Sequence, residues 1–197
     1  MIDLQTLTIS YGKKVLVDSV NAEFAPGTVY GLVAPNGHGK TTLLRAMAGL
    51  PGPRVDGSIV LDEVQGTGAR EVRSMIFYAP GEGTLLYPGL RAEDHLKMVC
   101  DMWPHARDIE EIVEQPQRGE FAKMRIRTLS QGMKQQLTLA IAYATGARYL
   151  LLDEPMNARD PSRVDLHSEI LRKLADSGTC IIRSSHILYS VDRLCDE

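Results

Sequence analysis

Residues 34–42 of the chain read Ala-Pro-Asn-Gly-His-Gly-Lys-Thr-Thr, between an apolar run at 29–33 and a helix-forming segment at 43–48. A glycine-rich turn between a strand and a helix predicts a phosphate site, because backbone N–H groups and the helix N-terminus face the same anion. Lys40 would reach the terminal phosphates, and the Thr41 hydroxyl would ligate magnesium. The predicted nucleotide-binding residues of this loop are Asn36, Gly37, His38, Gly39, Lys40, Thr41 and Thr42.

One position departs from the pattern G-x-x-x-x-G-K-[ST], since Ala34 stands where the pattern begins with glycine. Alanine is disfavoured there only if the backbone needs a positive φ. We therefore expect nucleotide binding to be weakened at most. Taken alone, such a turn also occurs in α/β proteins that bind no phosphate.

The composition is that of a soluble globular protein, with 197 residues, 44% hydrophobic and 24% charged residues, and a net charge of -3. This length suits one domain with a subdomain. We expect no nucleic-acid partner, because basic residues are scattered apart from Lys123, Arg125 and Arg127. That trio is interpreted as a solvated face, with a contact to a partner protein as the alternative.

Nothing in the sequence predicts insertion into a membrane or secretion. The most apolar stretch, 137–152, is interrupted by polar residues and is shorter than a bilayer span of about 20 residues. The N-terminus lacks the basic start and apolar core of a signal peptide, so we expect a cytoplasmic protein. Cys100, Cys180 and Cys195 are too widely spaced to indicate a disulfide framework or a zinc site.

Two kinds of strand are predicted. Alternating apolar and polar residues at 2–10 and 14–24, with a further short strand at 59–61, indicate an antiparallel layer. Continuous apolar runs separated by helical stretches indicate a parallel sheet buried on both faces. These runs lie at 29–33, 75–78, 149–152 and 180–182, and the helical stretches lie at 95–102, 109–113 and 133–143.

Two further motifs contain residues that are candidates for binding or catalysis. Residues 129–136 read Leu-Ser-Gln-Gly-Met-Lys-Gln-Gln, and about twenty residues later 149–155 read Tyr-Leu-Leu-Leu-Asp-Glu-Pro. At the end of a buried strand, Asp153 can hold magnesium while the adjacent Glu154 polarises an attacking water. An Asp-Glu pair after a strand, taken alone, is more often a solvated strand end.

These motifs, together with the segment 157–161 and His186, resemble those of the ATP-binding-cassette (ABC) ATPases in their order and spacing. The resemblance spans nearly the whole chain. The resemblance implies an α/β P-loop NTPase with a mixed, mainly parallel core sheet, an N-terminal antiparallel β layer and a small α-helical subdomain. It divides the single domain 1–197 into an antiparallel β region (1–28 and 55–73), a RecA-like core (29–54, 74–85 and 146–197) and a helical subdomain with the signature motif (86–145).

The resemblance also implies roles for single residues. His186 would contact the γ-phosphate and orient the attacking water that Glu154 polarises. Tyr11 would stack on adenine, with a plain turn tyrosine as its alternative. Ser130 and Gly132 would bind the phosphate of an ATP held by a second subunit. Two chains, or one chain and a homologous ATPase, would thus enclose two Mg-ATP head to tail.

Several positions depart from the family pattern. Gly81 stands where relatives usually have a glutamine that touches magnesium, and Glu82 would replace it only if the loop shifts by one residue. We expect slow hydrolysis and an activating effect of Gly81→Gln. Met156 and Arg159 alter the contact expected across the dimer. Relatives normally continue beyond the His186 segment, so Glu197 ends either a short member or a truncated one.

The resemblance predicts an ATPase subunit that powers a separate transmembrane permease and lies on the inner face of the cell membrane through it, without inserting itself. The motifs most resemble bacterial exporters of peptides, drugs or bacteriocins. A nucleotide-gated binding or regulatory protein with little hydrolysis is the alternative. DNA-repair or translation ATPases of this family carry a long coiled-coil insertion or a second cassette, and neither is present.

Overall fold

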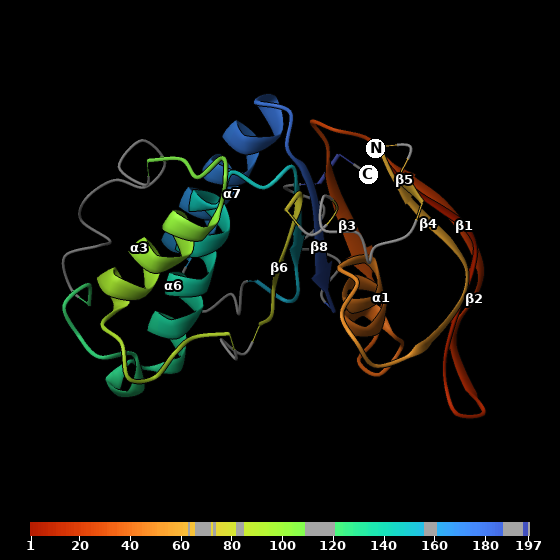
Figure 1. The fold of residues 1–197 in the computed structure, drawn as a ribbon, viewed down its shortest axis with the longest axis horizontal. Helices are drawn as coiled ribbons and strands as arrows, with labels where there is room; N and C mark the ends of the chain where they lie inside the picture. Colours follow the sequence, from red (N-terminus) through yellow and green to blue (C-terminus); the bar gives the residue numbers. More distant parts are fainter. Residues whose placement is uncertain are drawn as a thin grey trace.

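The fold contains two four-stranded sheets with helices on both faces of one of them (Figure 1). The computed structural model describes residues 1–62, 64–65, 72, 74–81, 85–108, 121–155, 161–186 and 195–196. One sheet has the strand order β2-β1-β4-β5 and the other β3-β8-β7-β6. Within the described part, no helix is long and apolar enough to span a membrane.

The first sheet is antiparallel, as predicted. Its strands are β1 (Ile2–Tyr11), β2 (Lys14–Phe24), β4 (Arg54–Leu61) and β5 (Val64–Gln65). The β1 side chains of Ile2, Leu4, Leu7 and Ile9 are buried, and the alternation shifts by one residue at Thr6, whose φ is 46°. The register of β1 with β2 shifts at the same place, which identifies a β-bulge.

The second sheet is parallel, and all its described strand pairs are parallel. Its strands are β3 (Val29–Val33), β6 (Ile76–Ala79), β7 (Tyr149–Leu152) and β8 (Cys180–Ser185). On β7, Tyr149 and Leu151 face the core shared with α1 (Lys40–Met47), whereas Leu150 and Leu152 face the opposite core. Burial of both faces explains why this strand is apolar throughout.

Three longer helices cover the other face of the parallel sheet or pack beside it: α3 (Ala92–Met102), α6 (Gln131–Ala144) and α7 (Pro161–Asp176). A 3₁₀ turn, η1 (Ile126–Thr128), precedes α6. The helices predicted at 43–48, 95–102 and 133–143 are confirmed as α1, α3 and α6, each of which begins two or three residues earlier. The stretch 109–113 lies outside the described residues. The sequence analysis missed α7, although Ile170, Leu171 and Leu174 have helical spacing and are buried.

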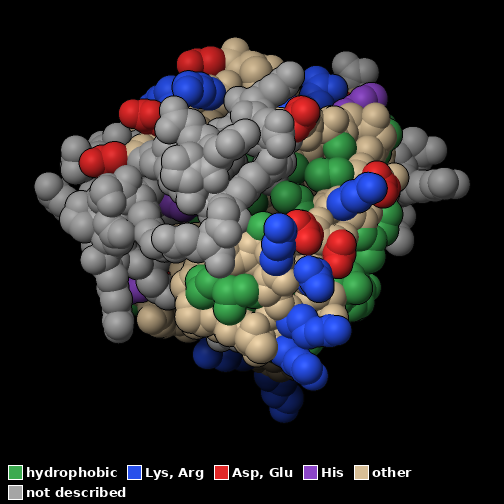
Figure 2. Space-filling model, turned by 90° about the vertical axis from the view of Figure 1, so that its left-hand side faces the viewer, with side chains coloured by type: hydrophobic (Ala, Val, Ile, Leu, Met, Phe, Trp, Pro, Cys, Tyr) green, Lys and Arg blue, Asp and Glu red, His purple; other side chains and the backbone are tan. Residues whose placement is uncertain are grey.

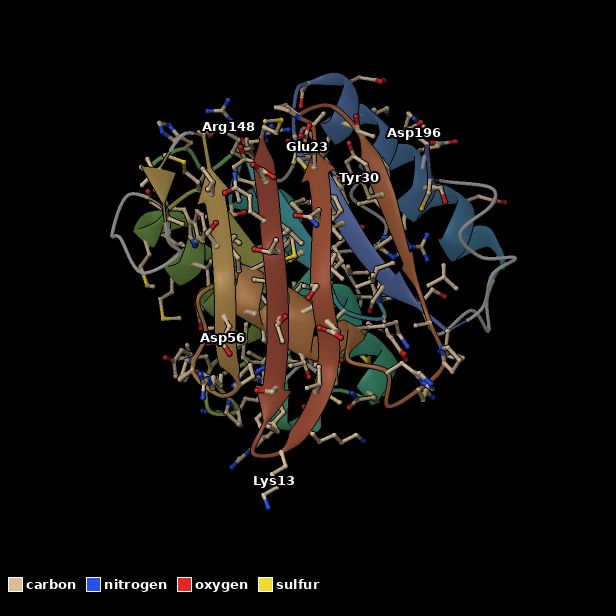
Figure 3. The ribbon with its side chains drawn as sticks, turned by 90° about the vertical axis from the view of Figure 1, so that its right-hand side faces the viewer. Lys13, Glu23, Tyr30, Asp56, Arg148 and Asp196 are labelled. Atoms are coloured by element: carbon tan, nitrogen blue, oxygen red, sulfur yellow. The ribbon has the colours of Figure 1, made fainter. Side chains whose placement is uncertain are left out.

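The surface carries mixed charge. The side of the molecule formed by the helices displays acidic, basic and apolar side chains near one another (Figure 2). Lys123, Arg125 and Arg127 are all exposed, and Arg125 Nη1 donates a hydrogen bond to the Gly89 carbonyl oxygen at 2.8 Å. Most exposed side chains of the antiparallel sheet are polar, although Val15 and Val55 are exposed as well, and Lys13 lies at the tip of the β1–β2 hairpin (Figure 3).

The parallel arrangement brings several predicted site segments to one edge of the sheet. In a parallel sheet all carboxyl ends of the strands lie at the same edge, where open α/β proteins bind their ligands. The loop 34–39 follows β3, His186 follows β8, Asp153 and Glu154 follow β7, and Gly81 follows β6 after Pro80. Since β8 and β7 are adjacent in the sheet, His186 and Glu154 become neighbours.

Candidate active site

The loop between β3 and α1 is shaped by glycines. Gly37 and Gly39 have φ values of 81° and 88°, which are left-handed, and Gly39 is the N-cap residue of α1. A side chain at Gly39 would also press against Leu16 of β2, with a Cβ 3.3 Å from the Leu16 Cβ. Ala34 does not have a positive φ. Its departure from the motif therefore causes no backbone strain.

Lys40 is buried at the start of α1, which is unusual for a lysine unless it is paired. Its Nζ donates hydrogen bonds to the carbonyl oxygens of Ala34 at 2.6 Å and Pro35 at 3.3 Å. The same Nζ lies 3.8 Å from Glu154 Oε1. The ammonium group is thus held between the loop and the end of β7, where a phosphate oxygen would find a cation.

The Asp153 carboxylate is buried and oriented by hydroxyl groups from both neighbouring strands. Ser184 Oγ of β8 donates to Oδ1 at 2.6 Å, and the Tyr78 hydroxyl of β6 donates to Oδ2 at 3.1 Å. Burial raises the pKa of Tyr78, and the charge of Asp153 raises it further, so the hydroxyl stays protonated as a donor. Neither Tyr78 nor Ser184 was predicted to have a role.

The Glu154 carboxylate lies close to two basic side chains. Its Oε1 lies 3.3 Å from His186 Nδ1 as well as 3.8 Å from Lys40 Nζ, and its side chain is 33% exposed. A partly exposed carboxylate with a basic group on each side can accept a proton from a water next to a bound phosphate. Lys40, Asp153, Glu154 and His186 therefore form one cluster, which is called the carboxylate cluster below.

A divalent cation would need ligand atoms from a bound nucleotide in addition to protein groups. Among the described residues, no group of three His, Cys, Asp or Glu side chains is arranged to hold a metal. Magnesium usually takes one or two carboxylates together with substrate phosphates and water. The oriented Asp153 carboxylate and the exposed Thr41 at the start of α1 fit this donor set.

The remaining predicted residues lie around this cluster or away from it. Asn36, Gly37 and His38 are exposed on the loop, and Thr42 is half-buried in α1. Tyr11 is exposed at the β1–β2 turn.

Ser130 caps α6, where its Oγ accepts a hydrogen bond from Met133 N at 3.3 Å, and Gly132 is exposed. α6 and α1 cover opposite faces of the parallel sheet (Figure 1), and Gln135 of α6 contacts the backbone of Glu154. Glu82 and the segment 156–160 lie outside the described residues.

The backbone at Gly81 leaves little room for a side chain. A Cβ at this position would lie 2.7 Å from the Asp153 carbonyl oxygen and 3.6 Å from the Glu154 Cβ. Contacts below 3.0 Å require the surroundings to move. Gly81→Gln, expected above to activate hydrolysis by reaching magnesium, would instead displace the segment that carries Asp153 and Glu154.

We predict that Gly81→Ala and Gly81→Gln both lower the free energy of unfolding by about 1–3 kcal/mol, the usual cost of overpacking a close contact. Gly89→Ala is the matched control, because a Cβ there meets nothing within 4 Å. Urea unfolding of the three variants and the wild type measures the difference. Equal stability of Gly81→Ala and Gly89→Ala would show that the contact with Asp153 is not tight.

Known proteins resemble this chain over most of its length. The profile of a family described as ABC transporter matches residues 17–157. The lantibiotic transport ATP-binding protein SrtF of Streptococcus pyogenes is 34% identical over 199 residues, which cover 100% of this chain and 84% of the relative. The Nod factor export ATP-binding protein I of Sinorhizobium fredii is 35% identical over 201 residues, which cover 99% of this chain and 58% of the relative.

Solved structures show the same fold. The ATP-binding subunit of an ABC transporter superimposes with a TM-score of 0.86 at 25% identity, covering 100% of this chain and 83% of that one. A bacterial ABC transporter cassette, described as dimeric, gives a TM-score of 0.82 at 21% identity and covers 100% of this chain and 92% of that one.

Proposed function

The chain belongs to the ATP-binding subunits of the ABC transporter family, and we propose that it hydrolyses Mg-ATP at the carboxylate cluster to power a separate membrane permease. The observation that supports this most is that Lys40 Nζ and His186 Nδ1 both lie within 3.8 Å of Glu154 Oε1. This oxygen lies beside a phosphate loop whose shape depends on glycines. The backbone N–H groups of the loop and Lys40 would hold the β- and γ-phosphates.

Each residue of the cluster would have a separate task. Glu154 would accept a proton from the water that attacks the γ-phosphorus, and His186 would hold the γ-phosphate in place. Asp153 and Thr41 would hold the magnesium ion, whose charge neutralises the phosphate oxygens. Ser184 and Tyr78 would keep the Asp153 carboxylate in one orientation. Tyr11 would stack on the adenine.

The position of Ser130 and Gly132 supports a dimer. Ser130 is exposed at the N-terminus of α6, where the helix dipole favours an anion. Since α6 covers the face of the parallel sheet opposite to α1, we propose that Ser130 and Gly132 bind the nucleotide of a second subunit. A cassette with the same fold is described as dimeric, which supports a dimer.

A permease would meet the segment that follows β6. Leu85 and Tyr87 are 51% and 60% exposed, and such apolar side chains suit a protein partner. We propose that this contact holds the chain at the inner face of the cell membrane.

The adjoining helical subdomain (86–145) has a hydrophobic cluster of its own, which includes Leu86, Val99, Phe121 and Ile141 and supports the proposed division of the chain. The relatives are named for lantibiotic transport and for Nod factor export, so the named cargo differs between relatives of similar identity.

Dilution of the purified protein tests the proposal. Because each site would need a second chain, phosphate release per chain at saturating Mg-ATP should rise with protein concentration and then reach a plateau. EDTA should abolish it. Release that is independent of both protein concentration and EDTA would contradict a magnesium-dependent dimer.

A further inference from the structure

The backbone of Glu154 is strained. Its φ is 44°, in the left-handed region that residues other than glycine rarely occupy. Such a conformation costs roughly 1–3 kcal/mol and persists only where the surroundings hold it. The strain occurs at the residue whose carboxylate approaches Lys40 and His186.

Side chains from two distant elements hold this peptide in place. Ser184 Oγ of β8 accepts a hydrogen bond from Glu154 N at 2.9 Å. On the other side, Gln135 Nε2 of α6 donates to the carbonyl oxygens of Glu154 at 3.1 Å and Pro155 at 2.8 Å. The two amide hydrogens of Gln135 therefore fix two successive peptide groups immediately after the catalytic carboxylate.

We propose that Gln135 is a positioning residue for Glu154, which it acts on through these two carbonyl groups. This inference rests on the proposed role of Glu154 in hydrolysis. Without the amide, the chain at Glu154 is free to leave the left-handed conformation, and its carboxylate then moves away from the water. A displacement of about 1 Å in a reacting group can reduce a rate roughly 100-fold.

The location of Gln135 gives the hydrogen bonds a further consequence. Gln135 lies five residues after Ser130, about one and a half turns along the same helix. In the proposed dimer, Ser130 binds the partner's nucleotide, while Glu154 acts on the chain's own. The hydrogen bonds of Gln135 therefore join the helix that carries Ser130 to the peptide of Glu154.

Gln135→Glu tests this role with little change in volume. The carboxylate lacks the N–H donors and faces two carbonyl oxygens. We expect kcat to fall roughly 10- to 100-fold, while the Kd for a fluorescent ATP analogue stays within about 2-fold of the wild-type value. Gln136→Glu, with the same charge change on the adjacent position of α6, is the matched control. Gln135→Lys, which keeps a donor, should recover part of the lost kcat.

Four outcomes decide the question. Loss of kcat in Gln135→Glu alone, with unchanged ATP affinity and partial rescue in Gln135→Lys, supports the inference. A kcat equal to that of Gln136→Glu overturns it. Parallel loss of kcat, ATP affinity and thermal stability in both Gln135 variants also overturns it, since it identifies a purely structural role. Absence of hydrolysis in the wild type would instead refute the proposed function, and with it any positioning of Glu154 for catalysis.

Discussion

Lys40→Ala is expected to weaken ATP binding by about 10- to 100-fold or more. The hydrogen bond of an ammonium group to a phosphate is worth roughly 1.5–3 kcal/mol, and more where water is excluded. Lys40 is buried, and its Nζ already lies between the loop carbonyls and Glu154, so a phosphate in the loop would meet it without a large movement. Isothermal titration calorimetry with ATP measures the change.

Two further variants make this result specific. Lys40→Met keeps most of the buried stem, and it should lose affinity as Lys40→Ala does if the charge is responsible. Lys123→Ala removes an exposed lysine of the helical side and should bind ATP like the wild type. Unchanged affinity in a folded Lys40→Ala protein would place the nucleotide elsewhere.

The sequence predicts the parts of this molecule that local patterns determine. The loop 34–42 is predicted from its glycines, because two left-handed residues before a helix are needed there. The strand Tyr149–Leu152 is predicted from its unbroken apolar run, because both of its faces are buried. With Asp153 and Glu154 directly after this strand, the parallel topology then places them beside the loop.

Contacts between distant segments were not predicted. The hydroxyl of Tyr78 reaches Asp153 across 75 positions, Ser184 reaches it across 31, and Gln135 reaches Glu154 across 19. For the contacts of Tyr78 and Ser184, the available signal is a hydroxyl residue near the end of a strand. The sequence does not show which strand lies next to it in the sheet, so the partner of the hydroxyl cannot be predicted. For the same reason, the steric obstacle to Gly81→Gln was not predicted: the Asp153 carbonyl oxygen occupies the space that a side chain would need.

Glu154→Gln is expected to lower kcat by about 10²- to 10⁴-fold, the usual contribution of a general base. ATP affinity should stay close to the wild-type value, because the phosphates are assigned to the loop and Lys40. Glutamine has the size of glutamate, and the backbone contacts with Gln135 and Ser184 do not involve the side chain. Phosphate release at saturating Mg-ATP measures kcat, and a fluorescent ATP analogue measures affinity.

A second carboxylate provides the control for this variant. Glu93 is exposed in the first turn of α3, and Glu93→Gln should hydrolyse ATP like the wild type. His186→Ala should also be slow, since His186 Nδ1 lies 3.3 Å from the same Glu154 oxygen. Wild-type turnover in Glu154→Gln together with a slow His186→Ala would reassign the base to His186.

The most direct test of the whole account is the nucleotide that Glu154→Gln retains. The variant is incubated with Mg-ATP and passed over a size-exclusion column, and the nucleotide in each protein peak is extracted and identified. The account predicts a dimer that holds unhydrolysed ATP, whereas the wild type converts its ATP to ADP and phosphate. ADP in the Glu154→Gln peak, formed as fast as in the wild type, would contradict the role of the carboxylate cluster in hydrolysis.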